Sequence, residues 1–248
     1  MIGFRRPLAP AVVLVYLLAV SCGDDGPEPS RVFESAPWPA EEQLEYQVRE
    51  RDEILGACLL SVRTGSSDGR SVLEFRCSNP DETRRDDALV EVDSEILQPF
   101  ESTVTVSDLE DGSQTLVSTN YDGLRISRLA ESDNDHSEIT LTIPEPPEDG
   151  PDPGYYDDTS IFWLIRGASL GEDVEEAFLD INTRTGRIII ATLRVTGEET
   201  IKVPAGSFET WRVELKTASN TNTYWVEKSG ARRVIRARAE RDLLELVR

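Results

Sequence analysis

Residues 167–171 have the spacing of a nucleophile elbow, with glycine at both ends and Ser169 in the middle. In that motif the serine lies between a strand and a helix, and a histidine later in the chain acts as the general base. Here an apolar run that predicts a helix precedes the motif, and a strand pattern follows it. The only histidine, His136, lies upstream. We therefore predict a loop without acyl-transfer chemistry.

Asp133, Asp135 and Ser137 have the spacing of a calcium-binding loop. Such a loop requires glycine at its sixth position and glutamate at its twelfth, where this chain has Glu138 and Pro144. We therefore expect no metal site here. The whole stretch is typical of an exposed turn, histidine included.

Asp157 and Asp158 are adjacent carboxylic acids of the kind that can act as a general acid and a general base. Because they directly precede an apolar run, a role in capping a helix explains Asp158 without catalysis. No nucleophile–base pair and no cluster of metal-ligating residues stands out elsewhere in the sequence. We therefore predict that the protein is not an enzyme and carries no cofactor.

The N-terminus has the features of a bacterial lipoprotein signal. Two arginines precede an apolar run over residues 8–20, which is too short to span a bilayer as a helix. Small residues stand directly before Cys22, as in a lipobox, where the cysteine is acylated and the preceding peptide is removed. The alternative is an ordinary secretory signal that ends near a cysteine. We predict a lipoprotein signal peptide over residues 1–21, lipidation of Cys22, and a tether over residues 22–41 that is rich in proline and glycine. The protein is then exported and anchored to the outer face of a bacterial membrane, in the periplasm or at the cell surface.

The other two cysteines flank a turn-rich segment, residues 64–70, between two alternating runs. A hairpin folded symmetrically about this segment places Cys58 opposite Cys77 and pairs apolar residues with apolar residues along the same face. This register predicts a disulfide between Cys58 and Cys77. Two buried free thiols are the alternative, which export to an oxidising compartment disfavours.

The composition limits the partners of the protein. The chain carries 26 Lys and Arg against 47 Asp and Glu, for a net charge of −21. Such a surface repels the phosphates of nucleic acids and of anionic lipids, so we expect no nucleic-acid partner and no docking on membranes by charge alone. The hydrophobic share of 38% is enough to form a sizeable core.

Short alternating runs separated by turn residues recur along the rest of the chain and predict about twelve antiparallel strands. The clearest turn follows Val203: Pro204 presets φ and Gly206 can adopt a positive φ, which predicts a hairpin with a bulge at Gly206. Residues 144–154 are rich in proline and interrupt the strand pattern, either as a domain linker or as a crossover between two halves of one sheet. We favour the crossover.

Residues 158–166 predict one short helix, in which residues 161–165 are apolar nearly all round, so we expect it to be buried against the sheet as a plug or lid. We therefore predict an all-β domain over residues 42–248, built as a single large antiparallel curled sheet or a partly open β-barrel with one short buried helix. Four aromatic residues on the helix and on the strands after it are candidates to line an apolar cavity, and the alternative is that they fill a solid core: Phe162, Trp163, Trp211 and Trp225.

Several stretches follow one another as in the domain-of-unknown-function family 3108, which this chain resembles over roughly residues 41–247. The most specific are the helix at 158–166 and the proline turn at 203–208, with weaker matches that include residues 44–46 and 121–123. The resemblance implies an exported, β-rich protein, broadly similar to the curled sheets that carry lipid or lipoprotein in the periplasm. No activity is assigned to the family, so the resemblance implies no reaction.

Two functions remain open. The first is a lipid-anchored binding module that holds an apolar small molecule or lipid between the curled sheet and the helix. The second is a structural or partner-docking envelope lipoprotein with a solid core, which would present an exposed apolar patch or edge strand to another envelope protein.

Overall fold

A computed structural model describes residues 27–248, except residues 65–68, 134, 147–152, 219 and 240. Cys22 and the predicted signal peptide lie outside the described residues. No helix in the described part of the chain combines the length and the apolar composition needed to cross a membrane.

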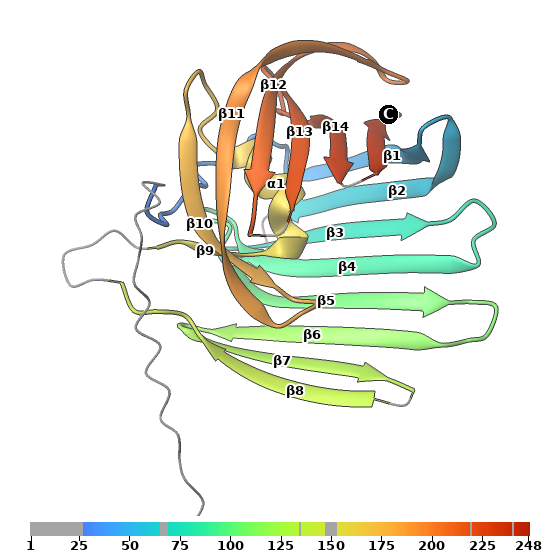
Figure 1. The fold of residues 1–248 in the computed structure, drawn as a ribbon, viewed down its shortest axis with the longest axis vertical. Coiled ribbons are helices and arrows are strands. Elements are labelled where there is room, and N and C mark those ends of the chain that lie inside the picture. Colours follow the sequence, from blue (N-terminus) through green and yellow to red (C-terminus); the bar gives the residue numbers. More distant parts are fainter. Residues whose placement is uncertain (1–26, 65–68, 134, 147–152, 219, 240) are drawn as a thin grey trace, which may run out of the picture.

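The described residues form one sheet of fifteen strands, shown in Figure 1. The first eight strands form a meander: β1 (Glu41–Glu50), β2 (Glu53–Thr64), β3 (Arg70–Ser78), β4 (Arg84–Asp93), β5 (Pro99–Asp108), β6 (Gln114–Asp122), β7 (Arg125–Ser132) and β8 (Asp135–Thr142). The other seven are β9 (Tyr155–Asp157), β10 (Glu175–Asn182), β11 (Arg187–Val203), β12 (Gly206–Lys216), β13 (Thr221–Glu227), β14 (Val234–Ala239) and β15 (Asp242–Leu246). The last strand, β15, pairs with β1, so the two halves become one continuous sheet. Every neighbouring pair is antiparallel except β9 and β10, which are parallel.

The register of the β2–β3 hairpin confirms the prediction made for the two cysteines. Cys58 lies opposite Cys77, and the apolar pairs Leu60–Phe75 and Val62–Leu73 follow along the same face. Cys58 and Cys77 form a disulfide. The hairpin therefore contributes both apolar contacts and a covalent cross-link to the inside of the sheet.

The sheet curls until its two edge strands approach each other without joining. β8 and β9 are the edges, and the Pro-rich segment connects one to the other, with residues 147–152 outside the described residues. Near this seam, Tyr121, Ile126 and Ile143 pack against Tyr155, Leu179 and Ile181 of the opposite edge. Side chains rather than backbone hydrogen bonds thus close the gap, and the prediction of one curled sheet or partly open barrel is confirmed.

A short helix lies inside the curled sheet, between β1–β5 and β10–β14 (Figure 1). It begins as a 3-10 turn, η1 (Asp158–Ser160), and continues as α1 (Ile161–Gly167). All residues of α1 except Phe162 are buried, as expected for a helix that is apolar all round. The capping residue is Asp157 rather than Asp158, because the Asp157 side chain accepts the backbone N–H of Thr159. Asp158 instead accepts hydrogen bonds from Thr183, just after the neighbouring strand β10.

Residues 29–38, here called the N-terminal strap, correct the predicted extent of the tether. Pro29 forms a bridge with Ala177, and Phe33 forms a bridge with Ala168 just after α1. Val32, Phe33 and Trp38 are buried in the main core. Gly167 permits this close packing, because a Cβ there would lie 2.1 Å from the Phe33 ring. Residues within the predicted tether thus belong to the folded domain.

The proline turn is found where it was predicted, but its bulge is not. Val203 and Gly206 pair directly across Pro204 and Ala205, and Gly206 adopts a φ of +140°. The register shift instead lies between Val195 and Gly197. β11 is therefore one continuous strand of 17 residues, whose bulge increases its twist and turns the hairpin end across the sheet. There the backbone N–H of Ala205 donates to the carbonyl of Leu246 at 3.1 Å.

Candidate functional site

The interior of the curled sheet contains two neighbouring cavities that share Phe75 in their walls. The disulfide cavity, of about 420 Å³, is lined by Cys58 and Cys77 among other residues. The helix cavity, of about 330 Å³, lies beside Phe162 of α1. In an antiparallel meander alternate turns lie at the same end of the sheet, and both cavities reach the end that carries the β3–β4 and β14–β15 turns.

Aromatic rings separate the helix cavity from the core. The Phe162 ring stacks against Phe75 at 5.5 Å between centroids and meets Tyr224 edge to face at 5.7 Å. All three residues line the helix cavity, and Val104 and Leu215 extend the apolar wall. One end of the cavity is therefore suited to an apolar group.

Of the four aromatic residues predicted to line a cavity, only Phe162 does so. Trp163 is buried in the core around α1. Trp225 follows Tyr224 on β13, so its side chain points to the opposite face of the strand. There the guanidinium groups of Arg236 and Arg238 stack on its ring, and its indole N–H donates to Glu199. Trp163, Trp225 and also Trp211 lie outside both cavities.

Trp211 is half-buried, and the Lys228 ammonium lies 4.2 Å from the centre of its ring. Of the predicted residues, Phe162 thus lies in a cavity wall, whereas Trp163 fills the core as in the alternative prediction, and the two strand tryptophans lie outside both cavities. Strand alternation and the neighbouring charged side chains decide these positions.

The other end of the helix cavity is acidic. Asp158 and Asp180 line it, and Asp157 is buried directly behind them. The Tyr121 hydroxyl donates to Asp157 at 2.5 Å, and Thr159 donates to the same carboxylate. The Tyr121 hydrogen bond therefore joins β6 on one side of the seam to β9 on the other.

Asp158 is held by the turn after β10. The Thr183 hydroxyl donates to its carboxylate at 2.7 Å and the Thr183 backbone N–H donates at 3.1 Å. On the other side of the seam the Arg128 guanidinium donates to the carbonyls of Thr183 and Arg184. Asp180 differs from its two neighbours, because its Oδ1 is buried and has no hydrogen-bond partner within the described part of the chain.

Burial raises the pKa values of all three carboxyl groups. Burial, and then the charge of Asp158, raises the pKa of Asp157 to about 7 despite the hydrogen bonds that it accepts. Burial also raises the pKa of Asp158, against the opposing effect of the Thr183 hydrogen bonds. The pKa of Asp180 is raised well above its usual range by burial, and further by the charges of Asp158 and Asp157. A strongly negative potential thus develops at this end of the cavity when the acids ionise.

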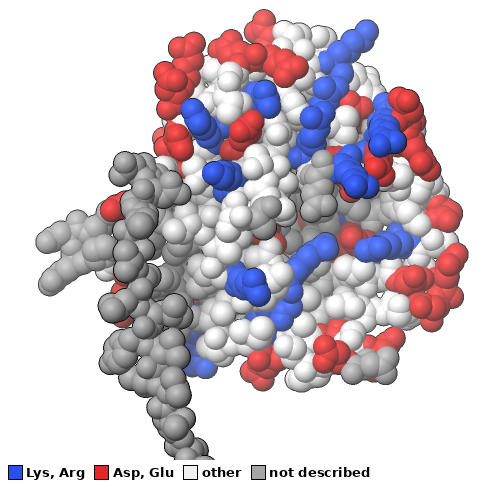
Figure 2. Space-filling view, viewed as in Figure 1, with Lys and Arg blue, Asp and Glu red and all other residues white. Residues whose placement is uncertain are grey.

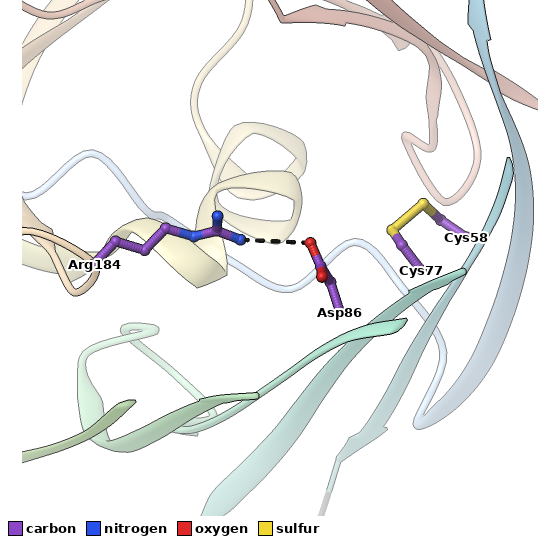
Figure 3. Close-up of a disulfide and its surroundings, with 4 residues drawn as sticks. All are labelled: Cys58, Cys77, Asp86 and Arg184. Carbon is purple, nitrogen blue, oxygen red and sulfur yellow. Dashed lines mark ion pairs between the residues drawn. A yellow bond between two sulfur atoms is a disulfide. The ribbon is translucent and has the colours of Figure 1, made fainter. Parts of the chain in front are cut away.

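Arg184 lies at the junction of the two cavities. Its guanidinium is 3.9 Å from Asp86 of β4, on the side of the interior that faces the disulfide (Figure 3). The Arg184 side chain is 61% exposed, so this contact is a loose surface ion pair. On the outer face shown in Figure 2, Asp and Glu side chains gather along the rim and Lys and Arg side chains lie nearer the middle.

The other residues considered for chemistry lie apart from these cavities. His136 belongs to β8 rather than to a turn, and its exposed ring lies 3.4 Å from Glu131. Gly167 ends α1, and residues 168–171 follow it as a connection that contacts the N-terminal strap. In the ranges that the structure describes, no group of three or more His, Cys, Asp or Glu side chains is arranged to hold a metal ion.

Sequence reasoning missed Asp180 and Tyr224. The available signal for Asp180 was a carboxylic acid between Leu179 and Ile181, in the apolar part of its strand. Tyr224 shares its strand with Trp225, and only the inward or outward direction of the strand distinguishes the two.

Comparisons with known proteins identify the family and the fold. Residues 92–243 match the family model described as protein of unknown function DUF3108. No curated protein matches the sequence. Among solved structures, a β-barrel-like protein of the domain of unknown function DUF1849 from Brucella abortus is similar, with a TM-score of 0.52 and 8% sequence identity. The alignment covers 84% of this chain and 96% of the Brucella protein, and at this identity it shows the fold alone. Since the family model spans more than half of the chain, the protein belongs to the DUF3108 family.

Proposed function

We propose that this protein is an exported binding module, anchored to a membrane through a lipid on Cys22, that holds an apolar or amphipathic ligand inside its curled sheet. The observation that carries the proposal is the helix cavity, which has an aromatic and aliphatic wall beside the packed core. Its volume of about 330 Å³ falls within the usual range of ligand sites.

The position of α1 supports this proposal. The helix and the N-terminal strap occupy one end of the curled sheet, where Arg166 of α1 contacts Glu42 at the start of β1. The cavities reach the other end. A ligand can therefore enter without displacing the helix, which keeps the cost of binding low.

The first test is native mass spectrometry of a Cys22→Ser form, exported by its own host and purified without detergent. An added mass that organic solvent removes supports a filled cavity, and the extract identifies the ligand class. Binding of 1-decanol to the emptied protein is then measured by calorimetry. The absence of both an added mass and decanol binding would contradict the proposal.

Replacement of either of two alanines by phenylalanine locates the site. Ala88 lines the helix cavity on β4, whereas Ala57 is exposed on the outer face of β2. Ala88→Phe fills the cavity and is expected to abolish decanol binding, while Ala57→Phe is expected to leave it unchanged. Circular dichroism checks that both variants fold. Equal decanol binding by the two folded variants would place the ligand elsewhere.

The second candidate function, partner docking, is favoured by one observation. β8 is an edge strand of eight residues, and its outer backbone groups are free of a neighbouring strand in the described sheet. Crosslinking in cells from a residue on β8, such as Thr140, tests this candidate. A specific envelope protein recovered together with an empty, non-binding interior would favour docking over ligand storage.

A further inference from the structure

The carboxyl group of Asp180 has no role in the internal network around it. The residue is 4% exposed and lines the helix cavity. Its Oδ1 is buried without a hydrogen-bond partner among the described residues. A buried carboxyl group without a donor is costly in free energy, so such a group in a cavity marks a place where a ligand can supply the donor.

The neighbouring charged groups already have interaction partners within the fold. Asp157 and Asp158 accept hydrogen bonds from Tyr121, Thr159 and Thr183, which satisfy them within the fold. Arg128 donates to backbone carbonyls across the seam. The Arg184 guanidinium, at the mouth of the cavity, is directed to Asp86.

No ion pair within the described ranges joins a Lys or Arg side chain to Asp180. A ligand that reaches Asp180 therefore meets up to three acidic groups, against the single basic side chain of Arg184, which lines the same cavity and is directed to Asp86. Such a site disfavours a carboxylate or phosphate and favours a cation.

The aromatic wall supports the same preference. Phe75, Phe162 and Tyr224 line the cavity that contains Asp180, and ring faces attract cations. The charge of Asp180 also acts on Tyr224, whose pKa it helps to raise after the larger effect of burial, so the two side chains are electrostatically coupled. The net charge of −21 further favours the approach of positively charged ligands.

We propose that the helix cavity binds an amphipathic amine, with its protonated amino group against Asp180 and its alkyl chain among Phe75, Phe162 and Leu215. This inference rests on the proposed binding function and specifies the ligand class. The amine belongs either to a free alkylamine or to the headgroup of an aminolipid, since both present the same ammonium group.

The test uses three probes of one chain length: decylamine, 1-decanol and decanoate. Binding is measured by calorimetry at pH 7.5 on the emptied Cys22→Ser protein, with each probe below its micelle concentration. Decylamine is expected to bind about tenfold or more tighter than 1-decanol, because a hydrogen bond between charged groups contributes a difference in affinity of that size. Decanoate is expected to bind most weakly. Equal affinities of decylamine and 1-decanol would overturn the ammonium site and leave the apolar site intact.

If none of the three probes binds, the proposed function itself fails. If decanoate binds most tightly, the cavity recognises anions through Arg184 and the present inference is wrong. The solvent extract of the exported protein distinguishes the two sources of the amine, because a free alkylamine and an aminolipid differ in mass. An extract that contains only neutral or acidic lipids would contradict both the free alkylamine and the aminolipid as ligands.

Asp180→Asn separates a ligand contact from a structural role. It is expected to bring the affinity for decylamine down to that for 1-decanol while leaving 1-decanol binding unchanged. It is also expected to leave the unfolding temperature of the empty protein undiminished, because the buried Oδ1 makes no hydrogen bond in the described structure that asparagine would lose.

The matched control is Asp122→Asn, the same change at an exposed position on β6, which is expected to alter neither property. A lower unfolding temperature in Asp180→Asn with an unchanged preference for decylamine would show that the carboxyl group serves the fold, and would overturn the proposal.

Discussion

Substitution of Glu42 tests whether a buried ion pair anchors α1 inside the sheet. The Arg166 guanidinium donates to both carboxylate oxygens of Glu42, at 2.6 and 3.0 Å, and to the carbonyl of Ala231 at 2.8 Å. It also lies 5.1 Å from the centre of the Trp38 ring. The Arg166 and Glu42 side chains are only 2% and 11% exposed, so water cannot replace a lost partner.

Glu42→Gln keeps the volume of the side chain and one acceptor oxygen but removes the negative charge. The Arg166 charge then remains buried without a counter-ion, and we expect the free energy of unfolding to fall by about 3 kcal/mol, the lower end of the range for broken buried pairs. For a chain of this length the unfolding temperature then falls by about 6–12 °C. Urea and thermal unfolding at pH 7, with the disulfide oxidised, measure both quantities.

The matched control is Glu45→Gln on the same strand. Glu45 pairs with Arg248, whose side chain is 77% exposed, so its loss is expected to cost less than about 1 kcal/mol. A double variant, Glu42→Gln with Arg166→Met, is expected to recover stability, since it removes the unpaired charge. If Glu42→Gln and Glu45→Gln lose similar stability, the buried pair does not hold the helix and our reasoning is refuted.

Three further predictions concern the seam, the disulfide and the N-terminal strap. The pKa of Asp157 is about 7 in the folded protein and 3.8 normally, so the folded state retains a proton that the unfolded state loses between these pH values. Through this group the free energy of unfolding therefore falls by up to about 1.4 kcal/mol per pH unit as pH rises from about 4 to 7. Unfolding measured across this range should show the slope, and Asp157→Asn should reduce it without removing it, because the pKa values of Asp158 and Asp180 are also raised. An unchanged slope in the variant would assign it to those other groups. Reduction of the Cys58–Cys77 bond, which closes a loop of sequence separation 19, should cost about 3 kcal/mol in denaturant unfolding, and equal stability of the two redox states would refute this. Gly167→Ala places a methyl group 2.1 Å from the Phe33 ring, so the strap should detach and be cut sooner by a protease than in the wild type, whereas equal resistance would show that the strap can adjust.

Much of the fold was predictable because it depends on local pattern. Alternation marked the strands, the apolar run at 161–165 marked the helix, and the register of Cys58 with Cys77 followed from matching apolar faces. The errors arose where contacts distant in the chain decide the structure. The N-terminal strap looks like a tether because it is rich in proline, yet Phe33 and Trp38 are buried against α1, more than 120 residues away.

The candidate site was predictable only in outline. The sequence indicated a cavity beside the helix, and Phe162 lines it. It did not indicate that β13 turns Tyr224 inward and Trp225 outward, or that the curl of the sheet brings Asp180 beside Asp157 and Asp158. A change of one residue in register exchanges the faces of a strand, and the sequence of one strand alone does not fix that choice.

The sequence by itself determined most of the strands, about twelve against the fifteen observed, and also the hairpin with its disulfide, the single buried helix and the family, because each depends on residue spacing within a short stretch. Only the tertiary structure decided that β15 pairs with β1, that the edges β8 and β9 meet through side chains, and that three acidic residues share one end of a cavity. The physical reason is that these features come from the closure of a curled sheet, which joins residues far apart in the chain. Closure also takes the carboxyl group of Asp180 out of water, and this burial turns an ordinary acidic residue into a candidate for ligand recognition.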